Sequence, residues 1–450
     1  MADPILVRFA GTGSGEGDLT WGQQQIWAAM RETDTSQSLR AVMPLPPGKT
    51  PADLAGELWF FLCRYPSLRS RLRFDADGGP RQVVSASGEI ALTVLDVTDG
   101  TDPAQAAEEL ADRWEHTTFD YTREWPIRLA AVRSHGVATH IVVVLNHLVA
   151  DGGGVAVMMD DLAKWDRRSE PDESPPTGVG PLELAQRQNT PATRRHSDTA
   201  LAHWGRLLRG ASPHRFASLP VPDQPRYRQA AFDSPAMRLA AHIVADRTGT
   251  ATPPVLLAAF AAALALTSGV HPVLTQTIVS NRFRPGLADA VHPVSQNGLL
   301  LIDIAGVTFD EAVTRAFRAS VLGSKHAYYD PAACDRLREQ IHLERGQAVH
   351  IGCVFNDRRQ GPGRFPTGPV PTPDQVRAAV PDHSLAWGEP LPLFNEQLMM
   401  TVDDAPDSVA LLVEVDTWYM AASDAETLLL TMESILVDAA LDPDARTGVS

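Results

Sequence analysis

Hydrophobic residues recur at helical spacing in many stretches of the 450-residue chain and at strand spacing in the stretches between them. After Pro51, for example, Leu54, Leu58, Phe61 and Leu62 fall on one face of a helix that opens with proline in its first turn. The same periodicity predicts further helices over residues 19–30, 103–117, 155–165, 198–210, 236–247, 253–268, 309–326, 331–345 and 423–440. It predicts strands over residues 68–74, 81–86, 127–133, 139–147, 272–280, 299–304, 349–356, 397–402 and 409–417.

The stretch 139–147, THIVVVLNH, differs from the other strands because it is apolar at nearly every position. That pattern is typical of a central strand whose two faces are both covered. Residues 134–136 before it suit a hairpin turn, and a glycine-rich turn leads from it to the helical pattern at 155–165. The order predicts a strand, a tight turn and a helix in succession.

Proline, serine, glycine and charged residues dominate residues 167–198, which indicates a linker or a surface excursion. A second interval rich in proline and glycine, residues 361–373, is expected to form a long loop. Helical and strand patterns lie on both sides of the first interval. We therefore expect an α/β (α+β) protein of two lobes, with residues 1–180 in the first and 181–450 in the second.

Composition narrows the classes of function. The chain carries 39 Lys and Arg against 55 Asp and Glu, a formal charge of −16, which argues against nucleic acid as a partner. Three scattered cysteines indicate a reducing compartment, and neither a signal peptide nor a comfortable membrane span is visible. We expect a cytoplasmic protein that makes no membrane contact. No spacing of Asp, Glu, His or Cys suggests a metal site.

The segment Asn146-His147-Leu148-Val149-Ala150-Asp151-Gly152 holds the candidate chemistry. An imidazole at the end of a buried strand can take a proton near neutral pH, and the glycines at 152–154 can leave backbone N–H groups free for an oxyanion. Taken alone, His147 is more often a structural histidine and Asp151 more often a helix N-cap. The glycine run matches neither a dinucleotide-binding fingerprint nor a P-loop.

A resemblance along residues 19–440 adds to this local pattern. NHLVADG (146–152) resembles the HHxxxDG signature of the condensation domains of nonribosomal peptide synthetases, whose wider superfamily includes chloramphenicol acetyltransferase-like acyltransferases. Further segments agree in the same order: TWGQQQIW (20–27) with the first family motif, RYPSLRSRLRF (64–74) with RHEALRTRF, SNRFRP (280–285) with a GRxRP-like turn, and SQNGLLLID (295–303) more weakly with FVNTL.

The resemblance implies a fold and a set of site residues. The fold is two chloramphenicol acetyltransferase-like lobes arranged as a V around a central tunnel, with His147 at mid-tunnel. His147 is implied as the catalytic base or as the group that orients the nucleophile, and the N–H near Gly152 as the oxyanion donor. Asp151 is implied to be structural, with Arg282 as its partner, and losing one member of such a pair costs about 3–5 kcal/mol.

Four positions need separate comment. Asn146 replaces the first histidine of the signature, and an amide there can still hydrogen-bond a neighbour. Asn297, within SQNGLLLID, is a candidate substrate-binding residue. Trp387 either lines a substrate pocket or is a loop hydrophobe, and both interpretations stay open. Gln25 stands where the first motif has arginine, which removes one possible partner of the histidine loop.

The implied function is an acyltransferase, a free-standing condensation enzyme that joins an acyl thioester to an amine in specialised metabolism. Its donor is expected on the phosphopantetheine arm of an acyl or peptidyl carrier protein, with no cofactor bound to the enzyme itself, and we expect a monomer. Ester formation onto an alcohol, an acyl-CoA donor, and a catalytically silent recruitment module remain alternatives. Carrier docking is predicted at a basic patch formed by Arg64, Arg69 and Arg71 or by the arginines at 206 and 209.

Overall fold

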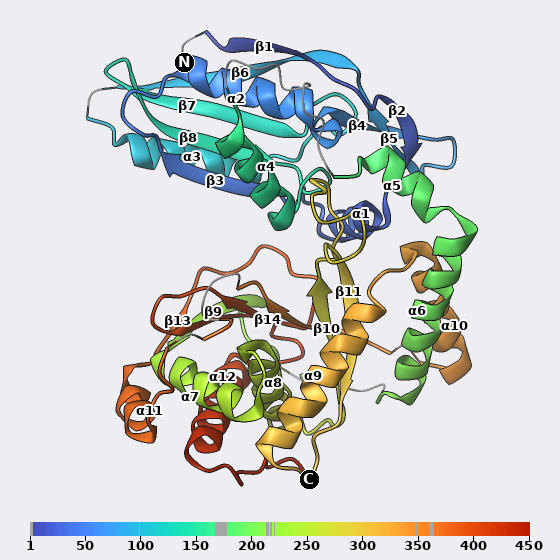
Figure 1. The fold of residues 1–450 in the computed structure, drawn as a ribbon, viewed down its shortest axis with the longest axis vertical. Helices are drawn as coiled ribbons and strands as arrows, with labels where there is room; N and C mark the ends of the chain where they lie inside the picture. Colours follow the sequence, from blue (N-terminus) through green and yellow to red (C-terminus); the bar gives the residue numbers. More distant parts are fainter. Residues whose placement is uncertain are drawn as a thin grey trace. The chain divides into compact units, whose positions relative to one another are not determined.

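The chain folds into two compact units, described here from a computed structural model of residues 3–98, 100–166, 178–212, 216, 218–219, 221–347, 349–359, 364–366 and 368–450. The first unit comprises residues 1–195 together with Ser280–Gln296, and the second comprises His196–Val279 and Asn297–Ser450. The division therefore differs from a single boundary near residue 180. A short segment from the second half of the chain packs with the first unit (Figure 1).

A five-stranded sheet forms the centre of the first unit, in the order β1-β6-β7-β8-β3 (Figure 1). Its strands are β1 (Ile5–Ala10), β3 (Leu39–Pro44), β6 (Ser87–Val97), β7 (Ile127–Ser134) and β8 (Val137–Leu145). β7 and β8 form an antiparallel hairpin. His135 and Gly136, with φ of 51° and 80°, make its turn, and a left-handed pair of this kind matches the twist of the flanking strands.

Helices cover both faces of this sheet, as the apolar run in β8 predicts. On one face Leu54 and Leu58 of α2 (Pro51–Arg64) pack with Leu129 of β7. On the other face Leu110 of α3 (Pro103–Glu115) packs with Val132, also of β7. Alternate residues of β7 thus face opposite cores, and the sheet holds the end of β8 in a fixed place.

The remaining elements of the first unit surround the end of β8. A three-stranded sheet has the order β2-β5-β4, from β2 (Gly15–Asp18), β5 (Pro80–Val84) and β4 (Ser70–Phe74), which follows the short 3₁₀ helix η1 (Pro66–Arg69). Helix α1 (Trp21–Thr33) begins with a capping box between Thr20 and Gln23. Helices α4 (Gly152–Lys164) and α5 (Pro181–Gln188) follow, and α6 (Pro191–Gly210) continues into the second unit.

The second unit is built on a seven-stranded mixed sheet in the order β11-β10-β12-β14-β15-β9-β13. Its strands are β9 (Tyr227–Ser234), β10 (Val273–Val279), β11 (Gln296–Ile302), β12 (Cys353–Asp357), β13 (Ser384–Trp387), β14 (Leu398–Asp403) and β15 (Val409–Asp416). Its helices after α6 are α7 (Pro235–Thr248), α8 (Thr252–Ser268), α9 (Phe309–Lys325), α10 (Pro331–Arg345), α11 (Pro373–Ala379), the 3₁₀ helix η3 (Val380–Asp382), and α12 (Ala422–Leu441).

Two cores lie in the second unit. The larger one surrounds α8, which is buried along almost its whole length and packs among α7, α9 and α12. The smaller one joins α6 and α10 through Trp204, Tyr329 and Ile341. Within the described residues no single helix is long and apolar enough to cross a membrane, although α7 and α8 pass that test as a pair bent by 111°.

Two expectations about connecting segments need correction. Residues 181–198 are helical rather than linker, because α5 and α6 bury Leu184 and Ala200 within the cores. Residues 167–177 of the expected linker lie outside the described residues. The loop expected at 361–373 lies partly outside them, and α11 begins at its last residue.

Candidate functional site

The chain after β8 forms a compact turn, residues 146–151, which we call the His147 turn. The N–H of Val149 donates to the carbonyl of Asn146 (3.1 Å), and the N–H of Leu148 donates to the Asn146 side-chain oxygen (2.9 Å). The N–H of Asn146 donates in turn to Pro126 (2.9 Å). Asn146 is 3% exposed, so its amide closes the turn from inside. The side chain that replaces the first histidine of the signature is thus used as a local cap.

His147 lies two residues beyond the end of β8, and its ring is half-buried. Its Nδ1 is 2.8 Å from the carbonyl oxygen of Ala150. A carbonyl oxygen can only accept, so Nδ1 carries the proton of the neutral ring and Nε2 keeps its lone pair. The backbone of the turn therefore fixes both the direction of the ring and its tautomer. A ring in this state can accept a proton from a substrate at Nε2.

Gln23 is a support of this turn that the sequence did not point to. Its side-chain N–H donates to the carbonyl of Leu148 (3.0 Å), and its side-chain oxygen accepts from the N–H of Thr20 (2.9 Å). Gln23 is 2% exposed. The sequence comparison drew attention to Gln25, two residues later in the same motif. The only local signal for Gln23 is its place in the capping box of α1, which says nothing about a contact 125 residues away.

Asp151 is the N-cap of α4 and the point where three segments meet. Its Oδ1 accepts from the N–H of Gly154 (2.7 Å) and from the guanidinium of Arg282. Its Oδ2 accepts from the hydroxyl of Ser295 (3.2 Å) and, at 3.4 Å, from the N–H of Val294. The two side chains of the ion pair are 8% and 16% exposed. A buried carboxylate with this many donors holds its surroundings in one geometry.

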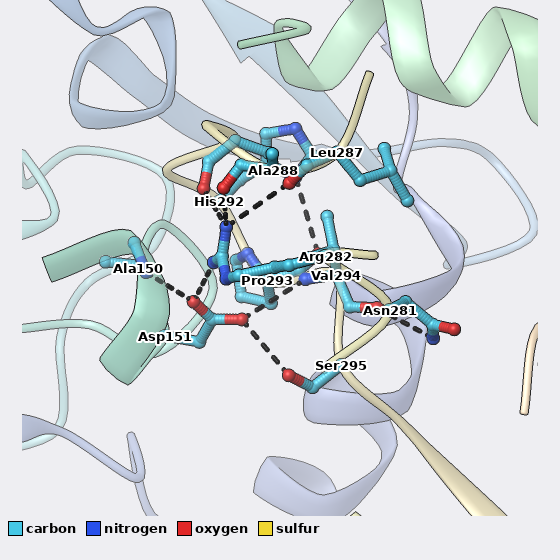
Figure 2. Close-up of polar contacts among 12 residues, drawn as sticks. Ala150, Asp151, Asn281, Arg282, Leu287, Ala288, His292, Pro293, Val294 and Ser295 are labelled. Carbon is cyan, nitrogen blue, oxygen red and sulfur yellow. Dashed lines mark hydrogen bonds and ion pairs between the residues drawn. The ribbon is translucent and has the colours of Figure 1, made fainter. Parts of the chain in front are cut away.

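Arg282 belongs to the segment Ser280–Gln296, which joins β10 to β11 and packs with the first unit. Figure 2 shows its guanidinium between Asp151 on one side and backbone carbonyls of its own segment on the other. The carbonyls of Leu287 (3.5 Å), Ala288 (3.4 Å) and Ala290 accept from the same terminal nitrogen. One side chain therefore shapes the segment and ties it to the start of α4.

Two of the three glycines at 152–154 are required by this packing. A Cβ on Gly153 would lie 2.1 Å from Nε of Arg282, and a Cβ on Gly154 would lie 1.9 Å from the carbonyl oxygen of Val291. A Cβ on Gly152 would meet nothing within 4 Å, and Gly152 is exposed. The missing side chains at 153 and 154 therefore let the segment 280–296 of the same chain pack closely against the start of α4. The first N–H of α4, at Gly152, has no acceptor in the described part of the chain.

The two candidate substrate-binding residues lie in the second unit. Asn297 is in β11 and is half-buried, and its side-chain N–H donates to the side-chain oxygen of Gln276 (3.1 Å). Trp387 ends the edge strand β13 rather than lying in a loop. Its indole N–H donates to Glu426 (2.7 Å), and Arg228 stacks on its ring at 4.1 Å. Both side chains therefore have protein partners.

The first of the two predicted basic groups does not form an exposed patch, whereas the arginines at 206 and 209 of the second group are exposed. Arg69 is fully buried and donates to the carbonyls of Gly11, Thr12 and Ser85, so it cannot contact a partner protein. Arg64 is 12% exposed and is paired with Asp161 (2.7 Å). Of the second group, Arg209 is paired with Glu344 (2.7 Å). Within the described residues, no group of three or more His, Cys, Asp or Glu is placed to hold a metal ion.

Comparison with known proteins finds relatives for most of the chain. The family model named "Condensation domain" matches residues 16–356. Chondramide synthase cmdD of Chondromyces crocatus is 26% identical over 300 residues, which are 63% of this chain and 7% of that synthase. The chain thus spans a small part of the length of this relative.

Solved structures of the same fold cover nearly all of the chain. One is a structure on condensation domain-mediated chain release from the enacyloxin polyketide synthase, with a TM-score of 0.70 and 19% identity over 96% of this chain and 83% of the other. Another is the X-domain from teicoplanin biosynthesis, with a TM-score of 0.71 and 18% identity over 97% of this chain and 98% of the other. Because the family model covers well over half of its residues, and the histidine signature lies inside the match, this chain belongs to the condensation domain family.

Proposed function

We propose that the chain is a condensation acyltransferase that joins a carrier-bound acyl or aminoacyl thioester to an amine. The observation that carries the proposal is the seating of His147. Its Nδ1 is held by the carbonyl of Ala150, so Nε2 presents a lone pair. Membership of the condensation domain family supports the same reaction class.

In the proposed reaction the amine nitrogen attacks the thioester carbonyl carbon. A C–N bond forms, Nε2 of His147 takes the proton that the nitrogen loses, and the carbon becomes a tetrahedral oxyanion. When the C–S bond breaks, the sulfur leaves with the electron pair and receives the proton from His147. The products are an amide and the free thiol of the phosphopantetheine arm. The arm acts as a substrate and is not a resident cofactor.

The start of α4 is the proposed oxyanion site. The N–H of Gly152 has no acceptor among the described residues and lies at the positive end of a 13-residue helix. A preorganised donor of this kind stabilises charge that develops in the transition state. Asp151 and Arg282 are proposed to hold the backbone of this turn in place, because their ion pair links the N-cap of α4 to the segment 280–296.

Purified protein, an acyl-loaded carrier protein and a panel of amines test the proposal. We expect amide product by mass spectrometry and a turnover loss of about 10²-fold or more in His147→Ala. His140→Ala is the matched control, because His140 lies in β8 of the same hairpin but outside the His147 turn. It should keep the turnover of the unsubstituted protein.

The same assay separates the alternative activities. Alcohol acceptors test ester formation, since an imidazole lone pair serves a hydroxyl as well as an amine, and acyl-CoA tests the donor. A His147→Ala protein that forms product at an unchanged rate contradicts the proposed role of His147. A protein without turnover on any donor would instead favour a recruitment module. A solved structure that shares the fold is the complex of the X-domain and OxyB from teicoplanin biosynthesis.

A further inference from the structure

A hollow opens beside the His147 turn within the first unit. It is partly open to solvent, and Asn146, Leu148 and Val149 of the turn line one side. Arg71 and Leu72 of β4 line another. None of these residues has a role in the transfer step proposed above except Asn146, which caps the turn.

Arg71 stands in this hollow without a protein acceptor. Its guanidinium lies over the ring of Trp125, 3.5 Å from the ring centroid, and its Nε is buried with no hydrogen-bond partner. No carboxylate among the described residues lies within 4 Å of it. Burial lowers the pKa of Arg71. The stack holds the plane of the guanidinium, and its terminal N–H groups have no acceptor among the described residues.

The neighbouring arginines differ from Arg71, because each of them has an acceptor. Arg69, two residues earlier, donates to three backbone carbonyls. Arg73, two residues later on the same strand, is paired with Glu16, and Arg81 on the adjacent strand is paired with Asp18 (2.6 Å). Arg69, Arg73 and Arg81 therefore each have acceptors, whereas Arg71 has none among the described residues.

Asn146 brings a second donor to the same hollow. Its side-chain oxygen accepts from Leu148, whereas its side-chain N–H₂ group has no acceptor within the described ranges. The carboxylate of Glu124 also lines the hollow, but it accepts from Arg128 (2.8 Å), which neutralises it. The hollow thus presents two donors, one of them cationic, and its one acidic group is already engaged.

We propose that this hollow binds the carboxylate of a small organic acid. The fork of Arg71 and the amide of Asn146 would donate to the two carboxylate oxygens, and the apolar side chains Leu72, Phe119 and Pro126 would contact the organic part. A guanidinium prefers a planar, bidentate acceptor such as a carboxylate. His147 is not among the residues that line the hollow, so binding is measurable without any acyl transfer.

Equilibrium titration with sodium benzoate tests the proposal directly. We expect saturable binding, at least about tenfold tighter than that of benzamide, which has the same shape without the charge. Arg71→Met keeps an apolar stem over Trp125 and should weaken benzoate binding by about tenfold or more. Arg73→Met is the matched control on the same strand and should bind benzoate as the unsubstituted protein does.

Several results would overturn the inference. They are equal binding of benzoate and benzamide, unchanged binding in Arg71→Met, or binding of inorganic phosphate in place of benzoate. If Arg71→Met does not fold, Arg71→Lys keeps the charge but not the fork and should weaken benzoate binding. His147→Ala should bind benzoate normally, so a failure of the acyltransfer proposal leaves this test intact. Soaked 4-bromobenzoate should place its bromine in the hollow of a crystal.

Discussion

Nδ1 of His147 and the carbonyl oxygen of Ala150, three residues later, are 2.8 Å apart. The two atoms belong to one turn, so the group that orients the ring is backbone and not another side chain. A serine hydrolase uses a buried carboxylate in that position. Here the carboxylate nearby, Asp151, is occupied by Arg282 and by the first turn of α4. The histidine therefore needs no charged partner to hold its tautomer.

The first prediction concerns this tautomer. When the ring of His147 is neutral, we expect its proton on Nδ1 and none on Nε2, because only a donor can face the carbonyl of Ala150. Nitrogen-15 NMR of histidine-labelled protein distinguishes the two nitrogens, and His147→Gln assigns the signal. A proton found on Nε2 at neutral pH would contradict the assignment and with it the base proposed for transfer.

The second prediction compares two adjacent glycines. Gly153→Ala should destabilise the protein by a few kcal/mol, because its Cβ would lie 2.1 Å from Nε of Arg282. Gly152→Ala is the matched control, since a Cβ there meets nothing within 4 Å and alanine favours a helix. Chemical denaturation of both variants measures the difference. Equal stability of the two would show that the segment around Arg282 moves aside freely.

The third prediction concerns the buried ion pair. Arg282→Met should lower the free energy of unfolding by about 3–5 kcal/mol, because it leaves the carboxylate of Asp151 buried without its cation. Asp151→Asn on top of Arg282→Met should recover part of that loss, since a neutral amide still caps α4. A double-mutant cycle by denaturation measures this coupling. Strictly additive losses would argue that the pair does not act as a unit.

The fourth prediction follows from two buried histidines. Burial lowers the pKa of His292 to about 4. Burial, together with the nearby charges of His326, Arg206 and Lys325, lowers the pKa of His203 to about 4. In the unfolded chain both rings titrate near 6.5, so the unfolded state binds more protons between pH 6.5 and 4.

Stability should therefore be fully present well above pH 6.5 and fall as the pH drops toward 4, by on the order of 2 kcal/mol for each of the two rings at pH 5. Thermal unfolding at a series of pH values measures the slope. His203→Phe should flatten it, because Phe keeps the ring stack on His326, 4.3 Å between centroids, and removes the titration. The exposed His350→Gln is the control. An unchanged slope in His203→Phe would assign the loss to other groups.

Periodicity predicted several of the elements whose own side chains fill a core. The helix α8 is buried on all sides and β8 packs against a core on each face, so their apolar runs are unambiguous. The predicted strands omit β1, β2, β3, β6, β9 and β13, of which β6 and β9 lie inside their sheets. β2 reads Gly-Glu-Gly-Asp, and β3 buries none of its side chains fully, so neither carries an apolar pattern. These strands form because a neighbouring strand supplies hydrogen bonds, which the local sequence does not encode.

In the candidate site, too, the local features could be predicted from the sequence and the long-range contacts could not. The tight turn after β8 and the cap at Asp151 follow from local residue types. Arg282 was named only through the family resemblance, and Gln23 was not named at all, because their contacts join residues 131 and 125 positions apart. The sequence also could not predict that Arg71 lacks an acceptor among the described residues, because this depends on which arginines of the small sheet meet an acceptor in the folded chain. Pairing over such distances is a property of the folded chain.

The passage of residues 280–296 into the first unit has a consequence for synthesis on the ribosome. The N-terminal half of the protein emerges first, yet the cation for Asp151 follows only after residues 196–279 have been translated. Until then the helix that begins at Gly152 has a carboxylate at its start and no guanidinium to neutralise it. The nascent chain therefore cannot form the ion pair at the start of α4 early, and a transcript truncated after residue 195 would encode Asp151 without Arg282 as its partner.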